Sequence, residues 1–111
     1  MFVVLCNDTE RSPSSAPQQI RFQPNDTSAD EIKRFKKLNA HAKRGCETLN
    51  EAVSMLALHC GYSLGAASAQ GRRIPDFKVP WHWTLDHFDR PDDSTWRIEL
   101  GYLQYTIKEV P

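Results

Sequence analysis

The chain has 111 residues, which suffice for one domain with one hydrophobic core and leave no room for a second. Its 14 basic and 14 acidic side chains cancel, so net charge provides no global attraction to nucleic acid or to a membrane surface. Three cysteines, an odd number without close pairing, are typical of reduced thiols in an intracellular protein and argue against a disulfide framework.

The N-terminal segment begins with a short apolar run and continues as loop. Residues 2–6, "FVVLC", are β-branched and aromatic, which predicts a buried strand. No basic stretch precedes this run, and it is too short for a signal peptide or a membrane span, so we expect a cytoplasmic protein without a membrane partner. Residues 7–27 are rich in Ser, Pro, Asn and Asp and are predicted to be largely loop, with one short strand at 18–23, "QQIRFQ".

Two capping boxes predict a helical hairpin over residues 29–60. The segments "SADE" at 28–31 and "TLNE" at 48–51 each place a hydroxyl residue three positions before a glutamate, and each is followed by apolar residues at helical spacing. Gly45 is expected to end the first helix, and Gly61 the second. One long helix with Gly45 in its interior is the alternative, because an interior glycine costs only about 1 kcal/mol.

Residues 80–109 predict a β-hairpin with its turn at 90–93, "RPDD". In that register one face is apolar and the other carries Asp86 opposite Arg97. The apolar positions shift from even to odd numbers after Gly101, which predicts a β-bulge in one long strand.

These elements predict an α+β protein with a single domain over residues 1–111. A small antiparallel β-sheet, made of the N-terminal strand and the C-terminal β-hairpin, is expected to pack on the two-helix hairpin, and residues 61–79 are expected to be a connector. The sheet residues Trp81, Trp83, Leu85, Ile98 and Leu100 are expected to face Ile32, Phe35, Leu38, Val53 and Leu56 of the helices.

A hydrolase pattern occurs at 61–65, where "GYSLG" spells G-x-S-x-G. The nucleophile elbow of such enzymes needs a strand before the serine, whereas Ser63 follows a predicted helix. Asp86 and His87 are adjacent, so in a strand they point to opposite faces and cannot both act behind one serine. We therefore predict no catalytic residues and no enzymatic activity.

Residues 48–73 also resemble a helix-turn-helix unit, and the order of helices followed by a hairpin resembles a winged helix. In this alternative the protein is a DNA-binding transcriptional regulator, with Ser68 and Gln70 as base readers and Arg72 and Arg73 on phosphates. The resemblance covers about seventeen residues, and two features depart from the pattern. Few side chains in the segment could contact DNA bases, and the hairpin tip, where a wing would approach the DNA, carries aspartates that repel phosphate. A connector without nucleic-acid contact is the favoured interpretation of this segment.

Metal binding is not expected. His41, Cys46, His59 and Cys60 have the residue types of a zinc site, but about twelve helical residues separate Cys46 from His59, which is roughly 18 Å at a rise of about 1.5 Å per residue. The cysteines are better explained as small buried apolar residues. We predict no metal and no cofactor.

The strongest surface signal is positive charge on the first helix, while residues 76–109 are net acidic. Such a face can simply be solvated, or it can dock on an acidic protein surface or a phosphate backbone. We expect a small intracellular binding protein that regulates or inhibits a macromolecular partner, of the kind carried by a phage or other mobile element, with a protein as the favoured partner and a monomer and a homodimer both left open. The expected contacts are Lys33, Arg34, Lys36, Lys37, Lys43, Arg44, Arg72 and Arg73, with Phe88 and Tyr105 as exposed apolar anchors.

Overall fold

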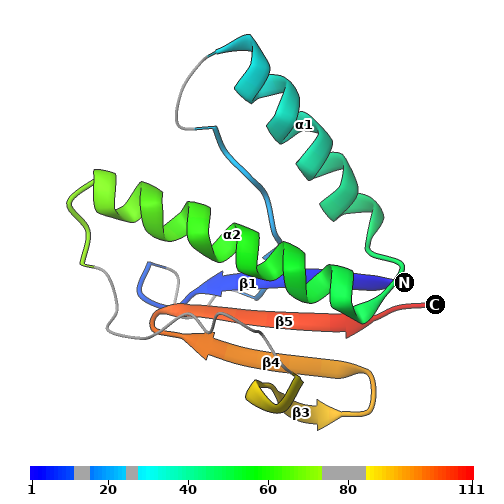
Figure 1. Cartoon of the computed structure of the whole chain (residues 1–111). Coiled ribbons are helices and arrows are strands. Elements are labelled where there is room, and N and C mark those ends of the chain that lie inside the picture. Colours follow the sequence, from blue (N-terminus) through cyan, green and yellow to red (C-terminus); the bar gives the residue numbers. More distant parts are fainter. Residues whose placement is uncertain (12–15, 25–27, 74–84) are drawn as a thin grey trace.

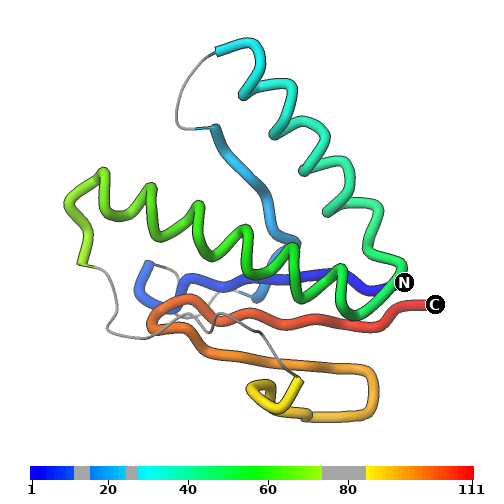
Figure 2. The backbone as a smooth tube through the Cα atoms, viewed as in Figure 1, coloured from blue at the N-terminus to red at the C-terminus, as the bar shows by residue number. Residues whose placement is uncertain are grey.

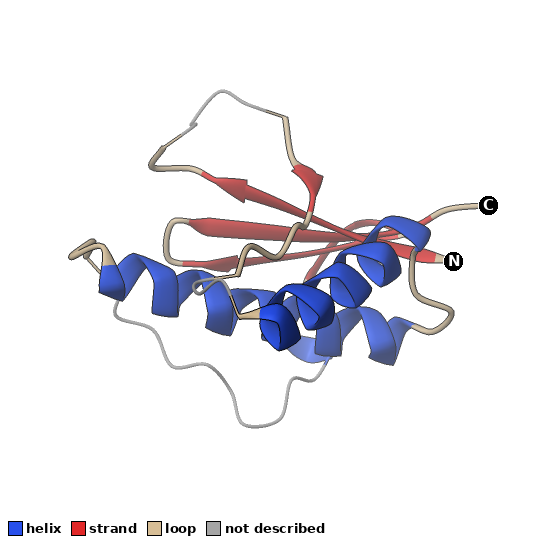
Figure 3. Ribbon diagram, turned by 90° about the horizontal axis from the view of Figure 1, so that it is seen from above, coloured by secondary structure: helices blue, strands red, loops and turns tan. Residues whose placement is uncertain are grey.

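A computed structural model describes residues 1–11, 16–24, 28–73 and 85–111. Five strands form one antiparallel sheet, and two helices lie on one side of it (Figures 1 and 3). This arrangement confirms the predicted α+β class. In chain order the elements are β1 (Phe2–Asp8), β2 (Gln18–Gln19), α1 (Ala29–Arg44), α2 (Leu49–Ala69), a 3-10 turn (Leu85–His87), β3 (Asp89–Asp92), β4 (Thr95–Leu100) and β5 (Leu103–Glu109).

The first and last strands of the chain are neighbours in the sheet. The strand order is β2-β1-β5-β4-β3, and every neighbouring pair is antiparallel. β1 pairs with β5 from Phe2 opposite Glu109 to Asp8 opposite Leu103, so the two termini lie side by side (Figure 2). The centre of the sheet is therefore built from contacts between opposite ends of the sequence.

The predicted bulge at Gly101 is wrong, because this residue lies in a turn. Gly101 and Tyr102 connect β4 to β5, and Leu100 lies opposite Leu103. Gly101 has φ +66°, the positive φ that the first central residue of a type II′ hairpin turn requires. A bulge and a two-residue turn shift the apolar phase in the same way, so the sequence pattern did not separate them.

The predicted register of the preceding hairpin is also wrong. Arg97 lies opposite Asp89 and not opposite Asp86. The turn forms two residues further along than predicted, where the Asp92 carboxylate accepts hydrogen bonds of 2.9 Å from both the N–H and the hydroxyl of Ser94. Residues 85–87, predicted as strand, form a 3-10 turn, and the expected strand residues at 81–84 lie outside the described residues.

The helices cover the sheet face that carries Val4, Ile98, Tyr105 and Ile107, all of which are buried. Tyr105 identifies this face because its hydroxyl contacts His59 of α2. Phe35, Val53, Leu56, Ile98 and Leu100 are buried as expected. Ile32 and Leu85 were expected in the core and are exposed, by 45% and 44% respectively.

Both predicted helix starts and the first predicted stop are confirmed. The hydroxyls of Ser28 and Thr48 accept hydrogen bonds from the N–H groups three residues later, as in a capping box. Gly45 ends α1 with φ +97°, a backbone conformation that a helix interior cannot contain. The alternative of one long helix is therefore wrong.

Residues 20–24, which we call the extended segment, lie between the two helices and hold α1 in place (Figures 1 and 2). Its Phe22 is 2% exposed, and its ring contacts Phe35 of α1 and both His59 and Tyr62 of α2. The Asn39 side chain of α1 bonds both the N–H and the carbonyl of Phe22, at 2.6 Å and 2.9 Å. Phe22 is thus the wedge through which α1 packs on the rest of the protein.

The helix α2 continues past the expected stop and runs unbroken to Ala69. Gly61 and Gly65 lie within it, and neither has a positive φ. The segment predicted as a connector at 61–79 is therefore helical at its start. Residues 48–73 contain one helix, which no turn interrupts before Ala69, so the helix-turn-helix interpretation is wrong for this segment.

Replacing Gly61 by alanine should raise the free energy of unfolding by about 0.5–1 kcal/mol, because alanine is the better residue in a helix interior. No atom lies within 4 Å of the position that the new Cβ would take, so no clash offsets this gain. Urea denaturation of the variant and the wild type measures the difference. If Gly61→Ala destabilised the protein, α2 would not be continuous at this position, and the helix end predicted at Gly61 would be favoured again.

Candidate functional site

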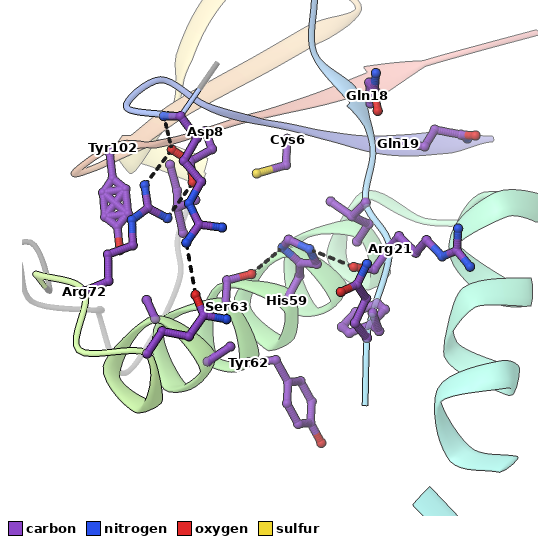
Figure 4. Close-up of a pocket in the computed structure, with 18 residues that line it drawn as sticks. Cys6, Asp8, Gln18, Gln19, Arg21, His59, Tyr62, Ser63, Arg72 and Tyr102 are labelled. Carbon is purple, nitrogen blue, oxygen red and sulfur yellow. Dashed lines mark hydrogen bonds and ion pairs between the residues drawn. The ribbon is translucent and has the colours of Figure 1, made fainter. Parts of the chain in front are cut away.

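A cavity of about 660 Å³ opens between β1, the extended segment and α2 (Figure 4). Its lining includes Cys6 and Asp8 of β1, His59 and Ser63 of α2, and Arg72 just beyond α2. Most of the polar groups that line it also bond one another, as the dashed lines in Figure 4 show. Those bonds decide which chemistry the cavity can support.

His59 is held as a neutral imidazole within the cavity. Its Nε2 lies 3.2 Å from the carbonyl oxygen of Arg21, which can only accept, so Nε2 carries the proton and Nδ1 the lone pair. The Tyr105 hydroxyl lies 2.8 Å from Nδ1 and donates to it. Burial lowers the pKa of His59 to about 4, because the charged form loses its hydration.

Ser63 is not activated by this histidine. Its hydroxyl lies 3.4 Å from Nδ1 of His59, a nitrogen that Tyr105 already occupies at 2.8 Å. An imidazole with so low a pKa is a weak base at neutral pH, and a nucleophilic serine needs a stronger one. The G-x-S-x-G pattern therefore lacks the activated serine of a nucleophile elbow. The sequence analysis considered His59 only as a possible zinc ligand and not as a partner of Ser63.

Two thiols next to Tyr105, the half-buried Cys6 and the buried Cys60, have raised pKa values. Burial raises the pKa of Cys6 and of Cys60 to about 11, so both stay protonated at neutral pH. Neither is in a disulfide, and Cys46 is likewise free. These properties suit small packing residues, as expected from the sequence.

At the far end of the cavity, Arg72 links the end of α2 to β1. Gly71 ends the helix with φ +72°, and the N–H of Arg72 bonds the carbonyl of Ala67 at 2.8 Å. The guanidinium forms two hydrogen bonds with Asp8, at 2.7 Å and 2.9 Å, and stacks 4.0 Å from the ring centre of Tyr102. Arg72 was expected to contact a partner, but its charge is already satisfied within the chain.

Removing this ion pair should destabilise the protein most at neutral pH. Arg72→Met is expected to cost about 1–2 kcal/mol at pH 7, since both partners are partly solvated. The hydrogen bonds from Arg72 lower the pKa of Asp8 below its ordinary 3.8, so the stabilisation is present above about pH 4 and disappears as the pH falls through the lowered value. Urea denaturation at pH 7 and near pH 2.5 measures both. A loss that is equal at the two pH values, or as large in the control Arg73→Met, would contradict the assignment.

One side of α1 carries a set of cations without internal partners. Their side chains are exposed; Lys33, Lys37 and Arg44 lie on the side of the helix opposite the buried Phe35 and Ala42, and the other two lie on one flank of that side. Among the described residues, ion pairs involve only Arg72, so no carboxylate neutralises any of the five. We call this set the α1 basic face: Lys33, Lys36, Lys37, Lys43 and Arg44.

The other predicted contact residues fall into different places. Arg34 stacks on the rings of Phe35 and Tyr62, at 5.6 Å and 5.4 Å, and Arg73 is exposed just beyond α2. Phe88 and Tyr105 were expected as exposed anchors, and this expectation is wrong because they are only 7% and 0% exposed. Tyr105 lies on the helix-facing side of β5, and Phe88 belongs to the core cluster.

The four residues of the DNA-binding alternative lie at the end of α2 and just beyond it. Ser68 and Gln70 are exposed at the end of α2, and the side-chain oxygen Oε1 of Gln70 accepts a hydrogen bond of 3.0 Å from the Arg11 guanidinium. Arg72 pairs with Asp8, as described above. Within residues 48–73 there is no second helix to enter a DNA groove.

The structure keeps His59 apart from Cys46, as the sequence predicts. His59 bonds Tyr105 and Arg21 in the cavity, far along α2 from Cys46. His41 and Cys46, in contrast, lie together with Glu51, and their ligand atoms are all within 4.8 Å of one another. Sequence reasoning missed this group because it assigned Glu51 only to a capping box.

No family model, curated protein or solved structure matches this chain, so function has to be inferred from side-chain geometry. Among the described residues, no helix is both long and apolar enough to cross a membrane. The main charged groups of the cavity are paired with each other, whereas those of the α1 basic face are not.

Proposed function

We propose that the protein is a small non-enzymatic binding protein that regulates or inhibits a macromolecular partner, and that it docks through the α1 basic face on an acidic surface of another protein. The observation that carries this proposal is that, within the described part of the chain, no ion pair involves the five exposed cations on one side of a helix. The side chains of Arg72 and Arg90, in contrast, bond other groups of the chain.

The spacing of these cations favours a flat, accessible contact. Lys33, Lys37, Ala40 and Arg44 follow one another at intervals of three or four residues, so they lie along one line of the helix surface. Ala40 is exposed at the middle of that line, and its small side chain lets a partner approach the helix closely. Like charges at this spacing repel each other, and carboxylates of a partner would relieve that repulsion.

The distribution of positive and negative charge over the molecule would also orient it as it approaches a partner. The acidic strand β3 carries the exposed Asp89 and Asp92 and lies at the opposite end of the molecule from α1 in Figure 1. The resulting dipole would turn the α1 basic face toward an acidic partner, which raises the association rate more than the final affinity.

Affinity capture combined with a DNA shift assay tests the proposal. Immobilised protein is incubated with a nuclease-treated lysate of the source cells, and bound proteins are eluted with a salt gradient and identified. The proposal expects an acidic protein in stoichiometric amount that elutes as salt rises, and no shift of duplex DNA. DNA binding with a steep salt dependence and no captured protein would support the DNA-binding regulator instead. Light scattering that shows only self-association would indicate a second copy, docked by its acidic strand, as the occupant of the basic face.

A further inference from the structure

The link between the two helices gathers three side chains that can each bind a metal. His41 lies in the last turn of α1, Cys46 follows its capping glycine, and Glu51 lies in the first turn of α2. One ligand atom from each is within 4.8 Å of the other two. In a tetrahedral zinc site with bonds of about 2.0–2.3 Å, ligand atoms are about 3.3–3.8 Å apart, so movements of about 1 Å would close the three around an ion.

The chemistry of this set suits zinc and not the hard cations. An imidazole nitrogen, a thiolate and a carboxylate oxygen are the three ligand types that Zn²⁺ accepts, whereas Mg²⁺ and Ca²⁺ prefer oxygen alone. The negative charges of one thiolate and one carboxylate would neutralise the ion, so no net charge is buried. The imidazole of His41 has no hydrogen-bond partner among the described residues and is free to bind.

Backbone contacts fix two of the three ligands before any ion arrives. Cys46 exchanges two backbone hydrogen bonds with Phe2, at 2.8 Å and 2.7 Å, and it is 1% exposed. One carboxylate oxygen of Glu51 accepts a hydrogen bond of 2.9 Å from the N–H of Glu47, which orients the carboxylate and leaves its other oxygen available. Such outer contacts are what keep metal ligands in position.

An entry path is also present. A shallow hollow of about 440 Å³ is lined by His41, Glu51 and Met55, and it is open to solvent. Water and ions can therefore reach His41 and Glu51 from solvent, whereas Cys46 lies beneath them and is 1% exposed.

We propose that His41, Cys46 and Glu51 bind one Zn²⁺ ion, with the fourth position held by water. Binding forms a zinc–sulfur bond as the Cys46 thiol releases its proton to solvent, and no electron is transferred. The ion would join the end of α1, the start of α2 and, through the Cys46 backbone, strand β1. None of the three ligands belongs to the α1 basic face, so this proposal stands or falls separately from the proposed function.

The test uses the full chain, stripped of metal with a chelator under reducing conditions and then titrated with Co²⁺ and Zn²⁺. We expect one equivalent of metal per chain, and a thiolate-to-cobalt charge-transfer band in the ultraviolet that Zn²⁺ displaces. The melting temperature should rise with Zn²⁺. Cys46→Ser and Glu51→Gln should each weaken Zn²⁺ binding by at least about tenfold, and Gln can still accept the bond from Glu47.

Cys6→Ser is the matched control, because it removes a thiol that lies outside the cluster, and it should leave Zn²⁺ binding unchanged. The spectrum of the wild type keeps the test decisive even if a variant fails to fold. Binding of less than one equivalent, a cobalt complex without the thiolate band, or affinity that survives Cys46→Ser would overturn the proposal.

Discussion

Replacing Phe22 by alanine is expected to lower the free energy of unfolding by about 3–5 kcal/mol, the usual cost of truncating a phenylalanine in a packed core. The ring is 2% exposed and lies 5.3 Å from the ring of His59 and 6.2 Å from the ring of Phe35, measured between ring centres. Each contact joins the extended segment to a different helix. Removal of the ring leaves a void between the helices, and α1 can close this void only by moving toward α2.

Chemical denaturation measures the loss, and hydrogen exchange shows where it falls. Protection should decrease first in the amides of α1, because Phe22 and the Asn39 bonds to it are main contacts of that helix. Gln23→Ala is the control, since its side chain is exposed, and it should change stability by less than about 0.5 kcal/mol. A cost below about 1 kcal/mol for Phe22→Ala would show that α1 does not depend on this wedge.

Acidification from pH 7 to pH 4 is expected to remove about 3 kcal/mol of stability through His59 alone. Burial lowers the pKa of this histidine from 6.5 to about 4 in the folded protein, and each pKa unit corresponds to about 1.4 kcal/mol. Between these two values the unfolded chain binds a proton that the folded chain does not, so unfolding is favoured as the pH falls. The contribution of His59 is constant above about pH 6.5 and again below about pH 4.

Urea denaturation at several pH values tests this expectation, with His59→Gln as the comparison. A glutamine can accept from Tyr105 and donate to the Arg21 carbonyl, but it does not titrate. The variant should therefore lose clearly less stability than the wild type over the same pH range. If the two proteins lose stability in parallel, the buried histidine is not the source of the acid sensitivity.

Local patterns in the sequence predicted the parts of the fold that local interactions decide. Both helix starts depend on a hydroxyl three residues before a glutamate, and the first helix end depends on Gly45, so these were found. Gly61 was misread because a helix-breaking residue costs only about 1 kcal/mol, which the burial of Leu56, Cys60 and Ala67 along the same helix outweighs.

The features that were missed depend on contacts distant in the sequence. A bulge and a turn at Gly101 give the same apolar pattern, and only the pairing of β5 with both β1 and β4 separates them. Phe22 was placed in a short strand, although its partners come from both helices. Phe88 and Tyr105 were chosen as exposed anchors for their residue type, but contacts with distant parts of the chain bury both in the core. The cavity around His59 likewise needs residues from three elements.

The most direct measurement on the α1 basic face is partner capture by a charge-reversed variant. Lys33→Glu, Lys36→Glu and Lys37→Glu are combined in one chain, and the control combines the same change at three exposed cations elsewhere, Arg11, Arg97 and Lys108. Both variants have the same net charge, and melting curves verify that both fold. We predict that reversal on α1 reduces the amount of protein captured from a nuclease-treated lysate by at least about tenfold, while the control retains most of it. Equal capture by the two variants would show that the α1 basic face is only solvated and that partners bind elsewhere.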